Sequence, residues 1–301
     1  MTGETVPRQT VPTESSSAET LLRASNLVKE FTVSGGGLLG RSGKFRAVDD
    51  VSLEVRKGET LALVGESGSG KSTTARLIAR LIGTTSGTIE FDGREVHALT
   101  GKALHGFRSE VQMVFQDPYS SLNPKHTVER IVTAPLAYQR RPIPGGARAF
   151  AGALMERVGL DPDHATRFPA QFSGGQAQRI GIARALAVSP KLIIADEAVS
   201  ALDVSVQAQV INLLRRLQDE EGFSYLFIAH DLAVVRQIAT RVAVMNGGRI
   251  VEAGDRDAVF GSPQHEYTRK LLAAVPRIRP EWDAARRRND QARREREDPG
   301  A

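Results

Sequence analysis

The sequence predicts an α/β domain built around a parallel sheet. Three apolar runs of strand length, LALVG (61–65), KLIIAD (191–196) and YLFIAH (225–230), each precede a polar loop. Each loop leads into a helix-like segment, such as KSTTARLIARLI (71–82) after the first run. Apolar runs of this length are typical of strands buried on both faces. The alternation of strand, loop and helix favours a ligand at the carboxyl ends of the strands.

Other segments predict two additions to this core. Residues 46–55 (RAVDDVSLEV) and 85–92 (TSGTIEFD) are typical of antiparallel strands joined by turns. Residues 34–44 (SGGGLLGRSGK) are rich in glycine and predict a loop. Residues 126–188 are mostly helical in pattern. We therefore expect an antiparallel β part and an inserted helical part beside the parallel sheet.

The composition is that of an ordinary globular chain. Of 301 residues, 41% are hydrophobic and 25% are charged, and none is cysteine. The lack of cysteine excludes disulfides, cysteine-ligated zinc and iron–sulfur clusters formed by this chain. No apolar run approaches the roughly 20 residues that cross a bilayer. Residues 1–20 are rich in Ser, Thr, Pro and Glu, so we expect a disordered tail and no secretory signal.

The net charge of +5 comes partly from the C-terminal end, where residues 276–301 hold eight arginines and six acidic residues. A mixed-charge tail of this kind is most often a solvated or helical appendage. We therefore expect no nucleic-acid partner.

A glycine-rich loop follows the first apolar run. Residues 65–72 (GESGSGKS) match the pattern G-x-x-x-x-G-K-[ST], in which backbone N–H groups surround phosphates. We call these residues the phosphate loop: Gly65, Glu66, Ser67, Gly68, Ser69, Gly70, Lys71 and Ser72. Lys71 is expected to reach the β- and γ-phosphates, and the Ser72 hydroxyl to ligate Mg²⁺. A dinucleotide loop is excluded because Thr73 stands at the position of its third glycine.

Acidic and imidazole side chains end the other two apolar runs. Asp196 closes the second run, where its carboxylate can hold Mg²⁺ through water. Glu197 comes next and can act as the general base for the attacking water. His230 ends the third run and can hydrogen-bond the γ-phosphate and hold Glu197 in place. Gln116 follows a short apolar strand, so its amide can reach the metal or the water.

The run FSGGQ (172–176) links these features to a known family. Together with the phosphate loop, Gln116, the Asp196–Glu197 pair and His230, it resembles the ATP-binding-cassette (ABC) ATPases. The segment SALD (200–203) matches their D-loop, and the resemblance covers roughly residues 21–275. It implies a P-loop NTPase (RecA-like) core with an antiparallel β subdomain and an inserted α-helical subdomain, and it implies ATP and Mg²⁺ as cofactors.

The resemblance also implies that two cassettes work together. The run 173–175 begins a helix and forms a second anion site, and one chain cannot fold both of its anion sites onto one ATP. In the family, two cassettes pair head to tail, and the signature of one covers the ATP of the other. The resemblance implies that Phe31 stacks on adenine. Further nucleotide contacts are expected from the phosphate loop and from Thr73, Ser173, Gly174, Gly175, Gln176 and Asp203. Catalytic roles are expected for Glu197, His230, Lys71 and Gln116, and metal contacts for Ser72, Gln116 and Asp196.

Further motifs indicate a subgroup within the ABC ATPases. QDPYSSLNP (116–124), EAVSALDVSVQAQV (197–210) and VFGSPQHEYTRKLLAAVP (259–276) resemble ATPase subunits of oligopeptide/dipeptide importers, a group that includes nickel and glutathione importers. The last motif reads HEYT (265–268) where HPYT is usual. The partners implied are a second ABC ATPase subunit, two transmembrane permeases and a solute-binding protein, at the cytoplasmic face of the membrane. The group often uses two different ATPases, which favours a heterodimer over a homodimer.

These patterns divide the chain into four parts. We expect a disordered tail at 1–20, a nucleotide-binding domain at 21–255 with its helical subdomain at about 119–188, an importer-type extension at 256–281, and a mixed-charge tail at 282–301. The leading function is an ATPase subunit that drives import of oligopeptides, dipeptides or a related solute. One alternative is an importer of nickel or glutathione. The other is a non-transport ABC ATPase, which is disfavoured because the chain has a single cassette and a short spacing between its motifs.

Overall fold

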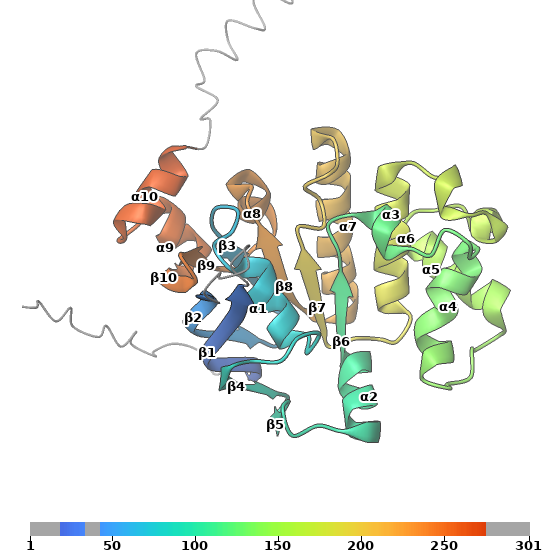
Figure 1. Cartoon of the computed structure of the whole chain (residues 1–301). Helices are drawn as coiled ribbons and strands as arrows, with labels where there is room; N and C mark the ends of the chain where they lie inside the picture. The colour runs from blue at the N-terminus through green and yellow to red at the C-terminus, as the bar shows by residue number, and fades with distance from the viewer. Residues whose placement is uncertain (1–18, 34–42, 275–301) are drawn as a thin grey trace, which may run out of the picture.

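The computed structural model describes residues 19–33 and 43–274 and confirms the predicted α/β class. Two sheets and a separate group of helices make up this part of the chain (Figure 1). Residues 1–18, 34–42 and 275–301 lie outside the described residues, and with them most of both predicted tails. Within the described ranges, no helix is long and apolar enough to cross a membrane.

The larger sheet has six strands in the order β10-β9-β3-β8-β7-β6. Its strands are β3 (Thr60–Val64), β6 (Val111–Val114), β7 (Leu192–Asp196), β8 (Ser224–Ala229), β9 (Arg241–Asn246) and β10 (Arg249–Asp255). Strands β9, β3, β8, β7 and β6 are parallel, and only β10 pairs antiparallel. Strands β3, β7 and β8 coincide with the three predicted apolar runs to within one residue at each end.

Both faces of this sheet are buried, as the apolar runs predicted. On β3, Ala62 and Val64 join one core, while Leu61 and Leu63 join another. The first core lies toward helices α7 (Val204–Glu221) and α8 (Leu232–Ile238). The second lies toward α1 (Lys71–Ile78) and the smaller sheet. The continuous hydrophobicity of these strands therefore reflects a sheet that is covered on both sides.

The smaller sheet is antiparallel, in the order β2-β1-β4-β5. Its strands are β1 (Thr20–Val33), β2 (Gly43–Arg56), β4 (Ser86–Phe91) and β5 (Arg94–Glu95). Two boundaries correct the sequence analysis. Thr20 pairs with Arg56, so the ordered chain begins before residue 21, and the predicted loop 34–44 loses Gly43 and Lys44 to strand β2.

Helix α1 is also shorter than the predicted 71–82. Arg80 adopts a left-handed backbone conformation with φ of 52°. Its guanidinium donates to the carbonyl oxygens of Val96 and Leu99, at 2.6 and 2.5 Å. A tertiary contact therefore ends the helix where the local helical pattern would continue it.

Helices between β6 and β7 form the inserted helical part, as predicted. They are α3 (Pro118–Ser121), α4 (Val128–Tyr138), α5 (Ala147–Arg157), the short 3₁₀ turns η1 (Pro162–Thr166) and η2 (Pro169–Gln171), and α6 (Gly174–Leu186). In Figure 1 they stand to one side of the larger sheet, beyond β6 and α7. Helix α2 (Gly101–Glu110) precedes β6, and α9 (Arg256–Gly261) and α10 (Glu266–Ala273) end the described chain at the opposite side.

Candidate functional site: a nucleotide site at the carboxyl edge of the sheet

The phosphate loop joins the carboxyl end of β3 to the first residue of α1. A Cβ atom at Gly65 would lie 2.1 Å from the carbonyl oxygen of Met245, and one at Gly70 would lie 2.4 Å from that of Ala47. Both residues also have positive φ angles, of 150° and 105°. Only glycine fits at these two positions, because any side chain would collide with backbone. Gly70 caps α1 without a side chain, which leaves the first helical N–H groups for an anion.

Lys71 lies inside this loop and is 4% exposed. Its Nζ donates to the carbonyl oxygens of Gly65 and Glu66, at 2.8 Å each, and lies 3.4 Å from Ser69 Oγ. Burial lowers the pKa of Lys71, while the carboxylates of Glu197, Asp196 and Glu66 act in the opposite direction. Burial is the larger effect, so the pKa of Lys71 lies below its usual value and the three carboxylates offset only part of the shift. In its ammonium form the side chain binds phosphate oxygens as a point charge.

Ser72 and Asp196 meet across the sheet edge. Ser72 Oγ donates to Asp196 Oδ1 at 2.7 Å. Asp196 ends β7 and is 5% exposed, and burial raises its pKa, whereas the hydrogen bond from Ser72 and the charge of Arg76 lower it. A buried carboxylate beside a hydroxyl is a set of oxygen donors that suits a small hard cation. Within the described ranges, no group of three or more His, Cys, Asp or Glu side chains could hold a metal.

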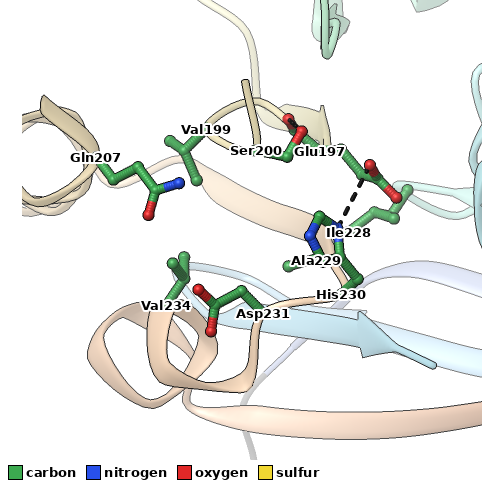
Figure 2. A pocket seen from close by; sticks show the side chains of 9 residues that line it. All are labelled: Glu197, Val199, Ser200, Gln207, Ile228, Ala229, His230, Asp231 and Val234. Atoms are coloured by element: carbon green, nitrogen blue, oxygen red, sulfur yellow. Dashed lines mark hydrogen bonds and ion pairs between the residues drawn. The ribbon is translucent and has the colours of Figure 1, made fainter. Parts of the chain in front are cut away.

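Glu197 and His230 face each other beyond the ends of β7 and β8 (Figure 2). His230 Nδ1 lies 3.5 Å from Glu197 Oε2. Glu197 has a φ of 49°, which is uncommon for a residue with a side chain and is typical of strained functional sites. Its N–H donates to the carbonyl oxygen of Ile228, and Ser200 donates from both N and Oγ to the Glu197 carbonyl. These three bonds fix the unusual backbone and aim the carboxylate.

Figure 2 shows that these two residues share a pocket with the start of α8 and one side chain of α7. The pocket is lined by Glu197, Val199, Ser200, Gln207, Ile228, Ala229, His230, Asp231 and Val234. The sequence analysis did not single out Ser200 for its bonds to Glu197, although it lies in the predicted D-loop segment.

Gln116 lies between β6 and α3 and is exposed. Its predicted contact with metal or water stays a prediction, because no hydrogen bond among the described residues joins its side chain to the phosphate loop. The segment that follows it is tied to α6 instead. Tyr119 Oη donates to the carbonyl oxygen of Phe172 at 2.8 Å, and Arg184 Nη1 donates to that of Ser121 at 2.6 Å.

The predicted signature opens helix α6, as expected. Ser173 is the N-cap: its N–H donates to Gln176 Oε1 at 2.9 Å, and its Oγ accepts from Gln176 N–H at 3.4 Å. This reciprocal capping box leaves the N–H groups of Gly174 and Gly175 at the helix start. A Cβ atom at Gly175 would lie 2.4 Å from Val206 Cγ1, so glycine is also needed here for packing against α7.

The structure does not bring this signature to the phosphate loop. In Figure 1 the start of α6 and the loop after β3 are separated by β8, β7 and α7. Asp203, at the N-cap of α7, is exposed, and the next residue, Val204, is 81% exposed. The residues assigned to ATP therefore fall into two separate groups on one chain.

The predicted aromatic, Phe31, lies on β1 and is 40% exposed, with Lys29 Nζ 5.2 Å from the ring centroid. It pairs in register with Phe45 of β2, which is 55% exposed. Phe45 is two residues before Ala47, whose carbonyl borders Gly70. Phe45 was not predicted from the sequence, because only the register of the β1–β2 pair shows that the two rings are neighbours.

Comparisons with known proteins agree with this geometry. A model of the ABC transporter family matches residues 48–200, and a model described as "Oligopeptide/dipeptide transporter, C-terminal region" matches residues 251–300. The chain is 50% identical over 288 residues to the glutathione import ATP-binding protein GsiA of Pectobacterium atrosepticum, covering 96% of this chain and 45% of that protein. It is 54% identical over 263 residues to GsiA of Escherichia coli K12, covering 87% and 42%. The chain thus spans less than half the length of these relatives.

Solved structures show the same fold. The dimeric post-hydrolysis structure of the ATP-binding cassette MJ0796, bound to ADP and Pi, matches with a TM-score of 0.69 and 29% identity, over 78% of this chain and 99% of that one. The structure of cbiO1 from Clostridium perfringens matches with a TM-score of 0.68 and 26% identity, over 86% and 97%. The family model, the fold and the order of motifs agree, and the chain belongs to the ABC transporter family.

Proposed function

We propose that the chain hydrolyses ATP with Mg²⁺ and that this energy drives import of glutathione or a related short peptide. The observation that carries the proposal is the convergence of three strand ends. Strand β3 leads to Lys71 and Ser72, β7 ends at Asp196 and is followed by Glu197, and β8 leads to His230. Carboxylate, imidazole, ammonium and hydroxyl groups thus share one edge of the sheet with free helical N–H groups.

Each group has a distinct task in this proposal. Lys71 and the loop N–H groups neutralise the β- and γ-phosphates. Glu197 accepts a proton from the attacking water, and His230, which lies 3.5 Å from its carboxylate, orients that carboxylate and reaches the γ-phosphate. Ser72 Oγ and Asp196 Oδ1, 2.7 Å apart, would hold Mg²⁺ with Gln116, and the metal would supply further charge neutralisation at the phosphates.

The second part of the proposal is a head-to-tail pair of cassettes. The signature at Gly174 and Gly175 and the exposed Asp203 are separated from the phosphate loop of their own chain by β8, β7 and α7. In this proposal they bind the ATP of another cassette. The MJ0796 cassette, 29% identical, is dimeric in its solved structure. We favour a partner cassette of different sequence, with two permeases and a solute-binding protein, at the cytoplasmic face of the membrane.

The relatives sharpen the choice of solute. The sequence analysis gave oligopeptides or dipeptides as its main expectation and a glutathione-type solute as an alternative. Relatives at 50% and 54% identity are named for glutathione import, which supports the alternative better. Glutathione is itself a tripeptide, so this choice agrees with the oligopeptide/dipeptide description that matches residues 251–300.

The test is ATP hydrolysis by the chain co-purified with its partners in liposomes. Wild-type complex should hydrolyse ATP only with Mg²⁺ and faster when solute-binding protein and glutathione are added. Lys71→Ala should lower nucleotide affinity and turnover by at least about tenfold, because it removes the buried charge on the phosphates. Lys102→Ala, at an exposed lysine of α2, is the matched control and should behave as wild type. Normal turnover in Lys71→Ala would contradict the site, and a lack of stimulation by both glutathione and short peptides would contradict the solute.

A further inference from the structure

The C-terminal helix α10 touches the phosphate loop directly. The hydroxyl of Tyr267 accepts a hydrogen bond from the backbone N–H of Glu66, at 3.0 Å. The two residues are 201 positions apart in the sequence. Figure 1 shows α10 beside the loop that connects β3 to α1. None of the catalytic or nucleotide contacts described above uses this tyrosine.

The bond falls on the peptide unit that also holds Lys71. The N–H of Glu66 and the C=O of Gly65 belong to one planar peptide group, and in a trans peptide they point in opposite directions. The Gly65 carbonyl accepts from Lys71 Nζ at 2.8 Å. Lys71 and Tyr267 therefore hold opposite edges of the same peptide, and rotating that peptide would break both bonds.

Tyr267 is itself firmly placed. The Glu252 carboxylate of β10 accepts from the N–H groups of Gln264 and His265, at 2.8 and 2.9 Å, just before α10. His265 Nδ1 then caps the helix by accepting from Tyr267 N–H at 3.1 Å. Burial raises the pKa of the Glu252 carboxyl, but the two N–H groups, the Thr268 hydroxyl and the charge of His265 together lower it below its usual value.

The face of α10 that carries Tyr267 also packs on the core beneath the loop. Thr268 is 1% exposed, and with Leu271 and Leu272 it lines a small cavity shared with Val64, the last residue of β3. Val64 leads directly into Gly65. The helix is thus fixed at its start by Glu252 and along its length by the strand that carries the phosphate loop.

We propose that Tyr267 is a positioning residue for the phosphate loop, through which the C-terminal extension sets the affinity of the site for ATP. Its hydroxyl fixes the Gly65–Glu66 peptide in the orientation that keeps Lys71 within the loop, ready for the phosphates. The extension then acts on nucleotide binding and leaves the chemistry at Glu197 unchanged. This inference rests on the proposed ATP hydrolysis.

The test is Tyr267→Phe, which removes only the hydroxyl acceptor. Loss of one neutral hydrogen bond should raise the KM for ATP about two- to tenfold, with kcat changed by less than about twofold. Tyr138→Phe is the matched control, because Tyr138 is 60% exposed on α4 and should leave both constants at wild-type values. Direct binding of a fluorescent ATP analogue should weaken by the same factor, and the melting temperature should stay the same.

A second variant tests whether Tyr267 acts through the docking of α10 or through a separate loss of rigidity in the protein. Glu252→Gln leaves one carbonyl oxygen for two N–H donors, so α10 should dock less firmly and the KM for ATP should rise. Since both residues act through one path, the double variant should show less than the product of the two single effects.

Two outcomes would overturn the inference: a KM for Tyr267→Phe equal to wild type, or effects of the two variants that multiply in full. If wild-type complex fails to hydrolyse ATP, the proposed function fails instead, and analogue binding still tests Tyr267.

Discussion

The phosphate loop and the signature helix are both anion sites at helix N-termini, yet they are built differently. In the phosphate loop, Lys71 is 4% exposed and its ammonium is surrounded by loop carbonyls. Gly65 and Gly70 press against backbone of β9 and β2. At the signature, Ser173 is exposed, and its side-chain bond stays within its own capping box. The shape of the first site is set by contacts within its own chain, and the second site is presented on the surface.

This difference shows which contacts fix the geometry of each site. The phosphate loop joins β3 to α1 and is contacted by β2, β7, β9 and α10 of the same chain, so its shape is set before any nucleotide arrives. The signature is held by two contacts: Gly175 lies against Val206 of α7, and the Phe172 carbonyl accepts from Tyr119 Oη. Its front, together with exposed Asp203 and Val204, requires a second molecule to become a buried site. Substitutions in the two regions should therefore impair different properties: turnover or nucleotide binding at the phosphate loop and its neighbours, and pairing of cassettes at the signature.

The largest effect is expected from a change at Glu197, beside the phosphate loop. We call the phosphate loop with Asp196, Glu197 and His230 the self-contained site, because contacts within one chain shape it. Glu197→Gln keeps the size and the backbone bonds of the residue but removes the proton acceptor. Turnover should fall about 10²–10⁴-fold while ATP binding stays within about twofold, measured by steady-state hydrolysis and by analogue binding. Glu156→Gln, at an exposed glutamate of α5, should leave turnover unchanged. Wild-type turnover in Glu197→Gln would remove this residue from the role of base.

A smaller and different effect is expected at the signature. Ser173→Arg places a long side chain on the exposed front of α6, where the proposed partner cassette approaches. In a Glu197→Gln background, which should accumulate ATP-bound pairs, this change should reduce ATP-driven pairing at least about tenfold, measured by analytical ultracentrifugation of the chain with its co-purified partner. ATP binding by the separate chain should stay unchanged.

Ala103→Arg adds the same charge at an exposed position of α2 and is the control for the pairing experiment. It should pair as the Glu197→Gln background does. Pairing that survives Ser173→Arg would show that the signature does not face the other chain, and the contrast between the two anion sites would lose its explanation.

The sequence could predict the self-contained site because its geometry is encoded locally. Eight consecutive residues fix the phosphate loop. Asp196 ends β7, and Glu197 and His230 each follow directly after a recognisable strand. The positive φ of Glu197 could not be predicted, because it depends on bonds to Ile228 and Ser200. The contact of Tyr267 with Glu66 depends on how the last helix docks, and no local pattern encodes a contact across 201 positions.

The same limit applies to strand pairing in the smaller sheet. Register shifts interrupt the pairing of β1 with β2 at four places, so the position of Phe45 opposite Phe31 could not be counted from the sequence. The end of α1 at Ile78 is another case, since Arg80 leaves the helix to bond Val96 and Leu99. Local motifs were thus predictable, and features that depend on long-range pairing were not.

The smallest effect is expected at the predicted adenine contact. Phe31 is 40% exposed on β1, and a stacked base would cover its ring. Phe31→Ala should raise the Kd for ATP about five- to tenfold, near the lower end of the range for one base stacked on an aromatic ring. Binding of inorganic tripolyphosphate, which has no base, should stay unchanged in the same titration. Phe45→Ala tests the neighbouring ring, which is 55% exposed, and should have the weaker effect. If Phe45→Ala weakens ATP binding more than Phe31→Ala does, the adenine contact belongs to β2, and the assignment of Phe31 is wrong.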